Sequence, residues 1–341
     1  MIDWHNIQSV ANQVGMVINS NHKGKQLVSM AYKIARKNMN VLVTGETGTG
    51  KEVMARFIHA ASSRADSIFI PVNCGAINES LLESELFGHE KGAFTGAVST
   101  RKGIFELARK GTLFLDELAD AARTTQVKLL RVIETGEFLR VGGEKTITSN
   151  ARIIAATNAD IESLVQDKKF REDLFYRLDV VRLELMPLRQ RLEDIPALVQ
   201  HFAAKFTGGG HTPAFPDSVL NALMSYPWHG NIRELQNVVQ QILAGDIKKT
   251  VALKDLPPKV LNHAANYKTT STSSPAPDIF RLNSGLTIKT GHAPTIFLPR
   301  SLREVEREHI EKTLAFFEGN VSMAARALGL SRATLYRKIK Q

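Results

Sequence analysis

The sequence predicts an α/β fold with a parallel sheet and flanking helices, followed by a smaller helical subdomain and a C-terminal all-α helix-turn-helix. Short apolar runs alternate with helical patterns through the first half of the chain, which is typical of a parallel sheet. After Pro187 the apolar runs stop and only helical patterns follow. From Gly319 to Gln341 the chain carries five Arg or Lys residues and no acidic residue, which favours contact with a polyanion.

The composition is that of a soluble globular protein. Of the 341 residues, 43% are hydrophobic and 23% are charged, and this length allows for about two domains. The net charge of +10 favours contact with nucleic acid or nucleotide. The single cysteine, Cys74, excludes an intrachain disulfide and fits a reducing compartment. Because we find neither a cationic leader nor an apolar run of about 18 residues, we expect a cytoplasmic protein without membrane insertion.

Hydrophobic periodicity places the elements in order. Strands are expected at Asn40–Thr44, Ile68–Val72, Thr112–Leu115 and Arg152–Ala156. Helical spacing predicts helices at Lys25–Asn38, Asp194–Phe206, Asp217–Tyr226 and Asn231–Leu243. A stretch rich in Ser, Thr and Pro at 269–277 is typical of a linker. We expect a short N-terminal segment (1–14), an α/β subdomain (15–186), a helical subdomain (187–262), a linker (263–300) and a DNA-binding domain (301–341).

The glycine-rich stretch after the first strand predicts a phosphate-binding loop. It follows a strand and opens a helix, so its backbone N–H groups and the helix N-terminus can hold phosphate oxygens while a lysine reaches the terminal phosphates of a nucleotide. A glutamate stands where the general pattern has a Ser or Thr ligand of Mg²⁺. The expected nucleotide contacts are Gly45, Glu46, Thr47, Gly48, Thr49, Gly50, Lys51 and Glu52.

Two adjacent carboxylates end the apolar run Thr112–Leu115. Buried carboxylates are costly unless they serve a charge, so Asp116 is the natural partner of Mg²⁺ and Glu117 the residue that polarises the attacking water. Both are expected metal contacts. Thr157 and Asn158 end the next strand, where a polar side chain can sense the terminal phosphate.

Two arginines six residues apart, Arg171 and Arg177, are candidates for stabilising the transferred phosphoryl group. Such an arginine can come from a neighbouring subunit, which would make oligomerisation a condition for hydrolysis. Taken without the phosphate loop, they would be two surface arginines with salt-bridge partners.

The stretch Gly88–Ala97 is too rich in glycine and alanine to build a core, which indicates a turn or a moving loop. It lies between the phosphate loop and the acidic pair.

Together these motifs resemble the sigma-54-dependent transcriptional activators of the NtrC class, which are bacterial enhancer-binding proteins within the AAA+ ATPases. The resemblance covers roughly residues 15–245 and the C-terminus. The hexapeptide GAFTGA is close to diagnostic of the class and is complete here. The matching motifs are GETGTGKE (45–52), GAFTGA (92–97), GTLFLDE (111–117), FREDLFYRL (170–178) and PWHGNIRELQN (227–237).

The resemblance implies a homo-oligomer, from dimer to hexameric ring, that hydrolyses ATP at subunit interfaces and remodels the closed complex of the sigma-54 RNA polymerase holoenzyme into an open one. It implies that Arg171 and Arg177 act in trans, that Asn73 pairs with the catalytic Glu117, and that Arg233 is a sensor in the lid. Residues 136–146 (GEFLRVGGEKT) resemble the second loop of this family, which precedes the sensor residues. The implied contacts with sigma-54 are Gly92, Ala93, Phe94, Thr95, Gly96 and Ala97.

The basic C-terminus predicts a helix-turn-helix, and it also resembles the Fis-type motif that ends this family. A terminal amphipathic basic helix is the alternative. Arg303–Phe317 is expected to be a dimerising helix, so the enhancer DNA should carry an inverted repeat. The expected core is Val321, Ala325, Leu328, Leu330, Leu335 and Ile339. The expected DNA contacts are Ser331, which caps the second helix, Arg332, Thr334, Tyr336, Arg337 and Lys338.

We expect no regulatory domain ahead of the ATPase, as in the minority of the family that resembles the phage-shock activator and is controlled by a separate regulatory protein; otherwise such a domain has been removed. Two other functions use the same phosphate site. An AAA+ unfoldase subunit would not be expected to end in a helix-turn-helix. A DNA-binding regulator of the TyrR kind would lack an intact GAFTGA hexapeptide.

Overall fold

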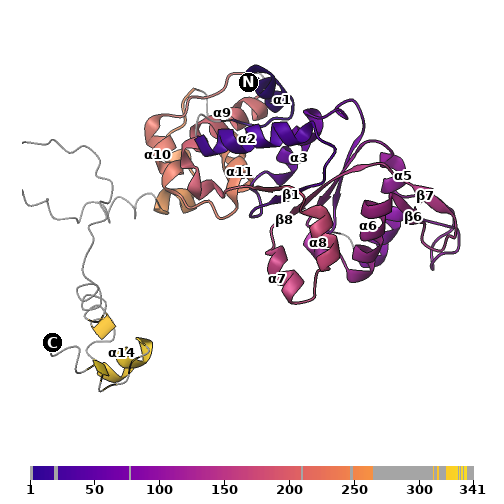
Figure 1. Cartoon of the computed structure of the whole chain (residues 1–341). Helices are drawn as coiled ribbons and strands as arrows, with labels where there is room; N and C mark the ends of the chain where they lie inside the picture. The colour runs from indigo at the N-terminus through magenta and orange to yellow at the C-terminus, as the bar shows by residue number, and fades with distance from the viewer. Residues whose placement is uncertain are drawn as a thin grey trace, which may run out of the picture. The chain divides into compact units, whose positions relative to one another are not determined.

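A computed structural model describes residues 3–18, 22–76, 78–208, 210–245, 249–263, 310, 313–314, 320–328, 330, 332 and 334–335 (Figure 1). The chain divides into two compact units, Met1–Pro275 and Ala276–Gln341. The helices of the described residues do not include one that is both long enough and apolar enough to cross a membrane.

A five-stranded parallel sheet forms the centre of the first unit, in the order β2-β5-β8-β1-β9. The predicted parallel sheet is therefore confirmed. Its strands are β1 (Val41–Thr44), β2 (Phe69–Asn73), β5 (Thr112–Asp116), β8 (Arg152–Thr157) and β9 (Arg182–Glu184).

Side chains alternate between the two faces of this sheet, as the period of two along a strand requires. Val41, Val43, Phe114, Ile154 and Ala156 point into one apolar core. The other core receives the intervening side chains Leu42, Leu113, Leu115, Ile153 and Ala155. Both faces are covered, which explains why these strands read as continuous apolar runs rather than as alternating patterns.

Helices cover both faces of the sheet (Figure 1). One core includes residues of α1 (Trp4–Gln13), α2 (His22–Ala35) and α3 (Lys51–Ala60). The other includes residues of α4 (Glu79–Phe87), α5 (Ile104–Ala108), α6 (Arg123–Thr135), α7 (Ile161–Gln166) and α8 (Glu172–Leu178). Two short antiparallel pairs are added, β3 (Gly88–His89) with β4 (Arg101–Lys102) and β6 (Glu137–Leu139) with β7 (Thr146–Thr148).

The predicted helical subdomain has its own apolar core. Its helices are α9 (Ile195–Phe206), α10 (Asp217–Ser225) and α11 (Asn231–Leu243), each within two residues of its expected bounds. Trp228 is the largest fully buried side chain of the described residues, and its Nε1 donates a hydrogen bond to the Leu223 carbonyl. Leu235, Val238 and Val239 of α11 complete this core.

Two features of the first unit differ from the expectation. Strand β9 was missed because its three residues, Arg-Leu-Glu, contain one apolar side chain. Residues 1–14 were expected only as a short N-terminal segment. Instead α1 is packed against α2 and α3, and its Ile7 and Ala11 are fully buried in the core that also holds Val41.

In the second unit, α14 spans Val321–Ala327. Ile310, Ala324, Ala325 and Leu335 are buried together, with Leu314, Val321, Leu328 and Leu330 partly buried against them. The described part of the expected helix-turn-helix core is thus confirmed, and Ile310 of the expected dimerising helix joins it. Ile339 and most of 303–317 lie outside the described residues.

If α1 belongs to the α/β core, Ile7→Ala should lower the free energy of unfolding by about 2–5 kcal/mol. The substitution removes most of a fully buried side chain and leaves a cavity in its place. Urea titration followed by circular dichroism measures this. Ser9→Ala, an exposed position of the same helix, is the matched control. Equal unfolding midpoints for the two variants would show that α1 is not part of the core.

Candidate functional site

The loop between β1 and α3 is folded around the ammonium group of Lys51. The Lys51 side chain is buried, and its Nζ donates to the carbonyls of Gly45 (2.8 Å) and Glu46 (3.2 Å). Thr49 Oγ1 donates to the Glu46 carbonyl at 2.7 Å. Gly48 has a φ of +80°, and a Cβ there would lie 2.3 Å from the Gly230 carbonyl oxygen, so this position requires glycine. The geometry is that of a phosphate-binding loop leading into a helix N-terminus.

The acidic pair lies at the end of β5 and lines the same cavity as Lys51. Asp116 Oδ1 accepts a hydrogen bond from the Glu117 N–H at 3.0 Å. Burial raises the pKa of Asp116 and lowers the pKa of Lys51, while the charge of each acts on the other in the opposite direction. Glu117 has a φ of +52°, a left-handed conformation that costs a residue with a Cβ about 1–2 kcal/mol. Strain of this kind is concentrated at functional sites.

These donors fit a magnesium ion. Mg²⁺ is usually held by one or two carboxylates together with water and substrate phosphates. Asp116 and Glu117 supply carboxylates beside the phosphate loop. Glu52 is paired with Arg56 (2.7 Å) one turn along α3, so its carboxylate is already engaged. Asp116 and Glu117 would therefore hold the metal.

Asn73 is the last residue of β2 and stands opposite Asp116 in the sheet register. The expected pairing of Asn73 with Glu117 is not formed among the described residues: Asn73 Oδ1 accepts the N–H groups of Gly75 (2.8 Å) and Ala76 (2.9 Å). The segment after β2 nevertheless lies against Glu117, because a Cβ on Gly75 would come within 2.8 Å of Glu117 Oε2.

The side chains of the two polar residues at the end of β8 make different contacts. Thr157 is fully buried, and its Oγ1 accepts the Ala159 N–H at 3.0 Å. Asn158 Nδ2 donates to Thr47 Oγ1 at 3.0 Å, so this side chain contacts the loop itself.

The lid contributes further residues that sequence reasoning missed. Arg191 donates to the Thr49 carbonyl at 3.0 Å and lines the cavity. Arg189 forms a bidentate ion pair with Glu46, with N···O distances of 2.8 and 2.5 Å. Hydrogen bonds from Arg189 and Asn231 hold the pKa of Glu46 at about 2. The expected sensor Arg233 also lines the cavity. The charged stretch 189–194 was the available signal, but the loop partners of Arg189 and Arg191 lie about 140 residues away.

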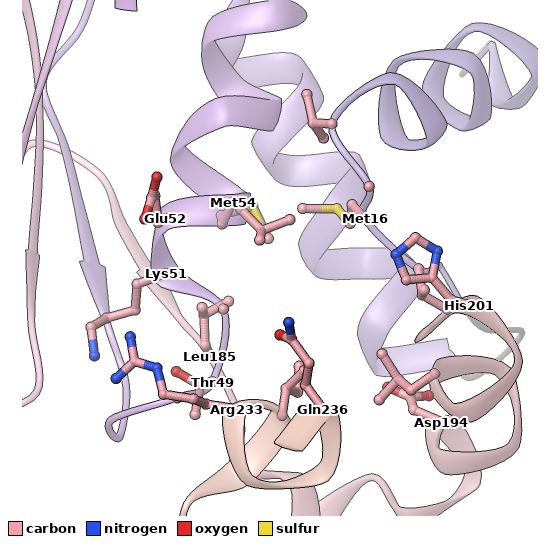
Figure 2. A pocket seen from close by; sticks show the side chains of 18 of the residues that line it. Met16, Thr49, Lys51, Glu52, Met54, Leu185, Asp194, His201, Arg233 and Gln236 are labelled. Atoms are coloured by element: carbon pink, nitrogen blue, oxygen red, sulfur yellow. The ribbon is translucent and has the colours of Figure 1, made fainter. Parts of the chain in front are cut away.

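The cavity has a volume of about 470 Å³ and two chemically distinct ends. Figure 2 shows Lys51 and Arg233 together at one end, with Met16 and Met54 facing each other farther along. Its apolar lining includes Met16, Val17, Ile18, Leu27, Val28, Met54, Leu185 and Phe202. A cavity with cations and backbone N–H groups at one end and apolar walls at the other suits a nucleoside triphosphate.

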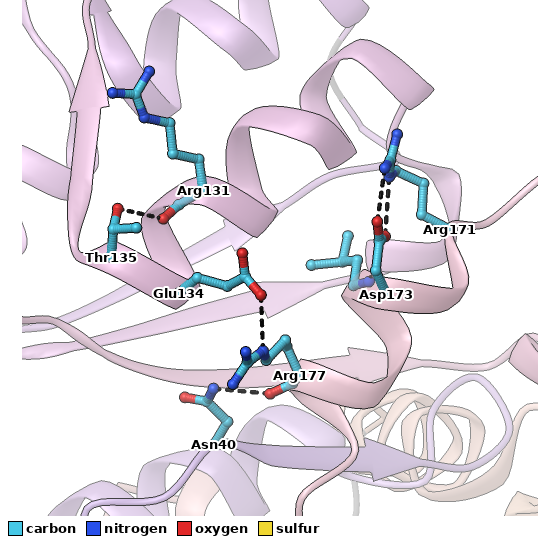
Figure 3. A network of polar contacts seen from close by, with 8 residues as sticks. Asn40, Arg131, Glu134, Thr135, Arg171, Asp173 and Arg177 are labelled. Atoms are coloured by element: carbon cyan, nitrogen blue, oxygen red, sulfur yellow. Dashed lines mark hydrogen bonds and ion pairs between the residues drawn. The ribbon is translucent and has the colours of Figure 1, made fainter.

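Arg171 and Arg177 lie at the two ends of α8 and are not among the residues that line this cavity (Figure 3). Arg171 forms two hydrogen bonds with Asp173, at 2.7 and 3.0 Å. Arg177 Nε donates to Glu134 Oε1 of α6 at 2.9 Å, and both arginine side chains are partly exposed. The chain therefore does not bring them to its own cavity.

The hexapeptide Gly92–Ala97 forms a closed turn between β3 and β4, in which the Gly92 N–H donates to the Ala97 carbonyl at 2.9 Å. Phe94, 40% exposed, and Thr95 point outward, whereas Ala97 is buried. Ala97 thus differs from the other expected sigma-54 contacts because it is not accessible in this conformation. The Phe94 ring stands edge-on to the His89 ring at 5.0 Å.

The second loop, between β6 and β7, supports this turn. Glu90 donates its N–H to the Val141 carbonyl (3.0 Å), and the Val141 N–H donates to the Gly88 carbonyl (2.9 Å). Arg140 pairs with Glu90 and with Glu106, each at 2.7 Å. The two loops therefore form one bonded unit.

At the C-terminus, Arg332 is exposed and Thr334 is half-buried. Ser331, Tyr336, Arg337 and Lys338 lie outside the described residues.

Comparison with known families divides the chain into three parts. The sigma-54 interaction domain matches residues 17–184, the AAA+ ATPase lid domain residues 189–273, and the bacterial regulatory protein Fis family residues 301–341.

Individual relatives span most of the chain. The regulatory protein AtoC of Escherichia coli K12 is 40% identical over 339 residues, which are 99% of this chain and 70% of AtoC. The transcriptional regulator NtrC of the same strain is 42% identical over 316 residues, 91% of this chain and 66% of NtrC.

Solved structures agree in fold. Crystal structures of NtrX from Brucella abortus, in complex with ADP and with ATP, match 99% of this chain with TM-scores of 0.66 and 0.65 at 29% and 30% identity, and the match covers 72% and 71% of the NtrX chains. Hsp104, at 18% identity and a TM-score of 0.54 over 76% of this chain and 52% of its own, shares the fold alone.

The predicted fold class, an AAA+ α/β domain with a helical lid and a helix-turn-helix, is thus confirmed. The chain belongs to the NtrC class of sigma-54-dependent enhancer-binding transcriptional activators, whose central domain is an AAA+ ATPase.

Proposed function

We propose that this protein binds enhancer DNA, hydrolyses ATP with Mg²⁺ at the end of the parallel sheet, and uses the hydrolysis to remodel the sigma-54 polymerase through Gly92–Ala97. The observation that carries the proposal is the short stretch of chain that connects the nucleotide cavity to the hexapeptide. Asn73 lies beside Asp116, and the chain then runs through the single helix α4 to β3 and the hexapeptide. A displacement at the end of β2 would therefore be carried by one helix to the loop.

The chemistry assigns roles to the charged residues of the cavity and to the two residues at the end of β8. Lys51 and the loop N–H groups would neutralise the phosphate charge, and Asp116 would hold Mg²⁺ against the phosphate oxygens. Glu117 would orient the attacking water, since it lines the cavity next to Asp116. Thr157 and Asn158 would report the terminal phosphate to β8, and Arg233 would report it to the lid.

The coupling would operate by exchange of hydrogen bonds. Asn73 is bonded to Gly75 and Ala76, and Glu117 lies against Gly75. When Glu117 turns toward water and phosphate, this segment loses a neighbour and Asn73 can exchange partners. The resulting shift at the start of α4 would move the unit formed by the hexapeptide and the second loop.

The oligomer would complete the site. Arg171 and Arg177 lie away from their own cavity and are engaged by Asp173 and Glu134, ion pairs that a neighbouring nucleotide can replace. A ring places one subunit's α8 against the next subunit's phosphates, so assembly would be a condition for hydrolysis. The C-terminal unit, with Arg332 exposed, would hold the ring on an inverted-repeat enhancer.

Thr95→Ala should abolish open-complex formation by sigma-54 polymerase while ATP turnover is retained. Thr95 is exposed at the tip of the turn and is not part of the cavity, so its hydroxyl and methyl can act on sigma-54 without touching nucleotide. Promoter melting measured by permanganate footprinting, alongside phosphate release, tests this. Ser99→Ala, which removes an exposed hydroxyl outside the hexapeptide, should melt the promoter normally. Full melting by Thr95→Ala would contradict the role given to the loop.

Arg171→Ala should lower ATP turnover by about a thousandfold or more while nucleotide binding is retained, as expected for an arginine supplied in trans. Subunit mixing sharpens the test. A Lys51→Ala chain lacks a working phosphate loop but keeps Arg171, and an Arg171→Ala chain has the reverse defect. Mixed rings should regain turnover above the sum of the two separate variants. Loss of nucleotide binding by Arg171→Ala, with no recovery on mixing, would place Arg171 in its own subunit's site.

A further inference from the structure

The junction between the lid and the phosphate loop is centred on one side chain, Asn231, the first residue of α11. It is fully buried and has a φ of +54°, a left-handed conformation that asparagine tolerates better than most residues. A buried polar side chain is retained at low cost only if its hydrogen-bonding groups are satisfied.

The amide of Asn231 joins three segments of the chain. Its Nδ2 donates to Glu46 Oε2 at 3.2 Å and to the Thr47 carbonyl at 3.0 Å, both in the phosphate loop. Its Oδ1 accepts the Leu188 N–H at 2.8 Å, at the start of the lid. The two loop contacts lie about 185 residues away in sequence, so they are purely tertiary.

Glu46 is held from both sides. Arg189 of the lid donates two hydrogen bonds to the same carboxylate, so Glu46 is bonded to both Arg189 and Asn231. We call Glu46, Arg189 and Asn231 the loop–lid clasp. Backbone contacts continue it, because the N–H groups of Ile232 and Arg233 donate to the Gly48 carbonyl at 2.9 and 3.3 Å.

Arg233 follows Asn231 by two residues on the same helix turn and reaches the cavity beside Lys51. The direction in which Arg233 enters the cavity is therefore set by how the first turn of α11 is seated on residues 46–48. We propose that Asn231 is a positioning residue for nucleotide binding and hydrolysis: through Glu46 and Thr47 it fixes the register of α11 on the phosphate loop, so that Arg233 points at the phosphates.

This inference rests on the proposed contact of Arg233 with nucleotide. A general stabilising role for Asn231 would be different in kind, because it would lower stability and activity whether or not Arg233 is present. The two roles therefore separate in a double-mutant cycle.

The test uses the full-length chain and the substitution Asn231→Asp. The carboxylate keeps the size of the amide, tolerates the left-handed backbone and still accepts the Leu188 N–H. It cannot donate, and it faces the Glu46 carboxylate and the Thr47 carbonyl. We expect kcat/KM for ATP to fall by about tenfold or more, because the buried residue 231 loses its hydrogen bonds to Glu46 and Thr47 and places a second carboxylate beside Glu46. Asn237→Asp, the same change at an exposed position of α11, should leave kcat/KM unchanged.

The cycle combines Asn231→Asp with Arg233→Ala. If Asn231 acts through Arg233, the loss caused by Asn231→Asp should largely disappear once Arg233 is absent. The same fold loss in both backgrounds would overturn the inference and leave the proposed function standing. Normal turnover by Arg233→Ala alone would contradict the proposed role of Arg233 and this inference together. Asn231→Gly, which suits the positive φ and removes the side chain, replaces Asn231→Asp in the cycle if the carboxylate prevents folding.

Discussion

The parallel pairing of the central strands is the constraint on which the rest of this structure depends. Because β1, β8, β5 and β2 run in the same direction, their carboxyl ends meet at one edge. The register sets Thr44 beside Thr157 and Asn73 beside Asp116. The phosphate loop, the acidic pair, Thr157 and Asn158 end or follow these strands. The backbone alone therefore gathers groups that are far apart in sequence.

Burial at this edge gives the charged groups their properties. An ammonium and two carboxylates in a partly desolvated cavity are costly singly, yet each stabilises the opposite charge. The carbonyls of Gly45 and Glu46 hold Lys51, and the backbone N–H of Glu117 holds Asp116. The same arrangement would leave both signs of charge available to a magnesium nucleotide. The lid closes the site from the other side through Glu46 and the Gly48 carbonyl.

Much of this fold could be predicted from the sequence, because short apolar runs and helical spacing are local signals. The four strands β1, β2, β5 and β8 begin within one residue of their expected positions. What could not be predicted depends on contacts made only after folding. Strand β9 is too short to show a period, and α1 joins the core through Ile7 and Ala11.

The candidate site follows the same division. Lys51, Asp116 and Glu117 could be found because strand ends and glycine spacing mark them. The links from Arg189 and Asn231 to Glu46 span more than 140 residues, and the single-residue signals at these positions do not name a partner. The exchange expected between Asn73 and Glu117 is a property of a nucleotide state, and the sequence cannot say which state a given structure adopts.

We propose that nucleotide at the sheet edge moves the Gly92–Ala97 turn. Cys74 is buried, and burial raises the pKa of its thiol to about 12, so introduced cysteines can be labelled selectively. One spin label is placed at Val98→Cys, beside the turn, and the other at Lys37→Cys, an exposed position of the α/β subdomain. With labelled chains diluted by unlabelled chain, pulsed electron paramagnetic resonance reports the distance between the two labels. The distance distribution should differ between ADP and an ATP transition-state analogue, and Lys51→Ala should remove the difference. Identical distributions with both nucleotides bound would contradict the coupling.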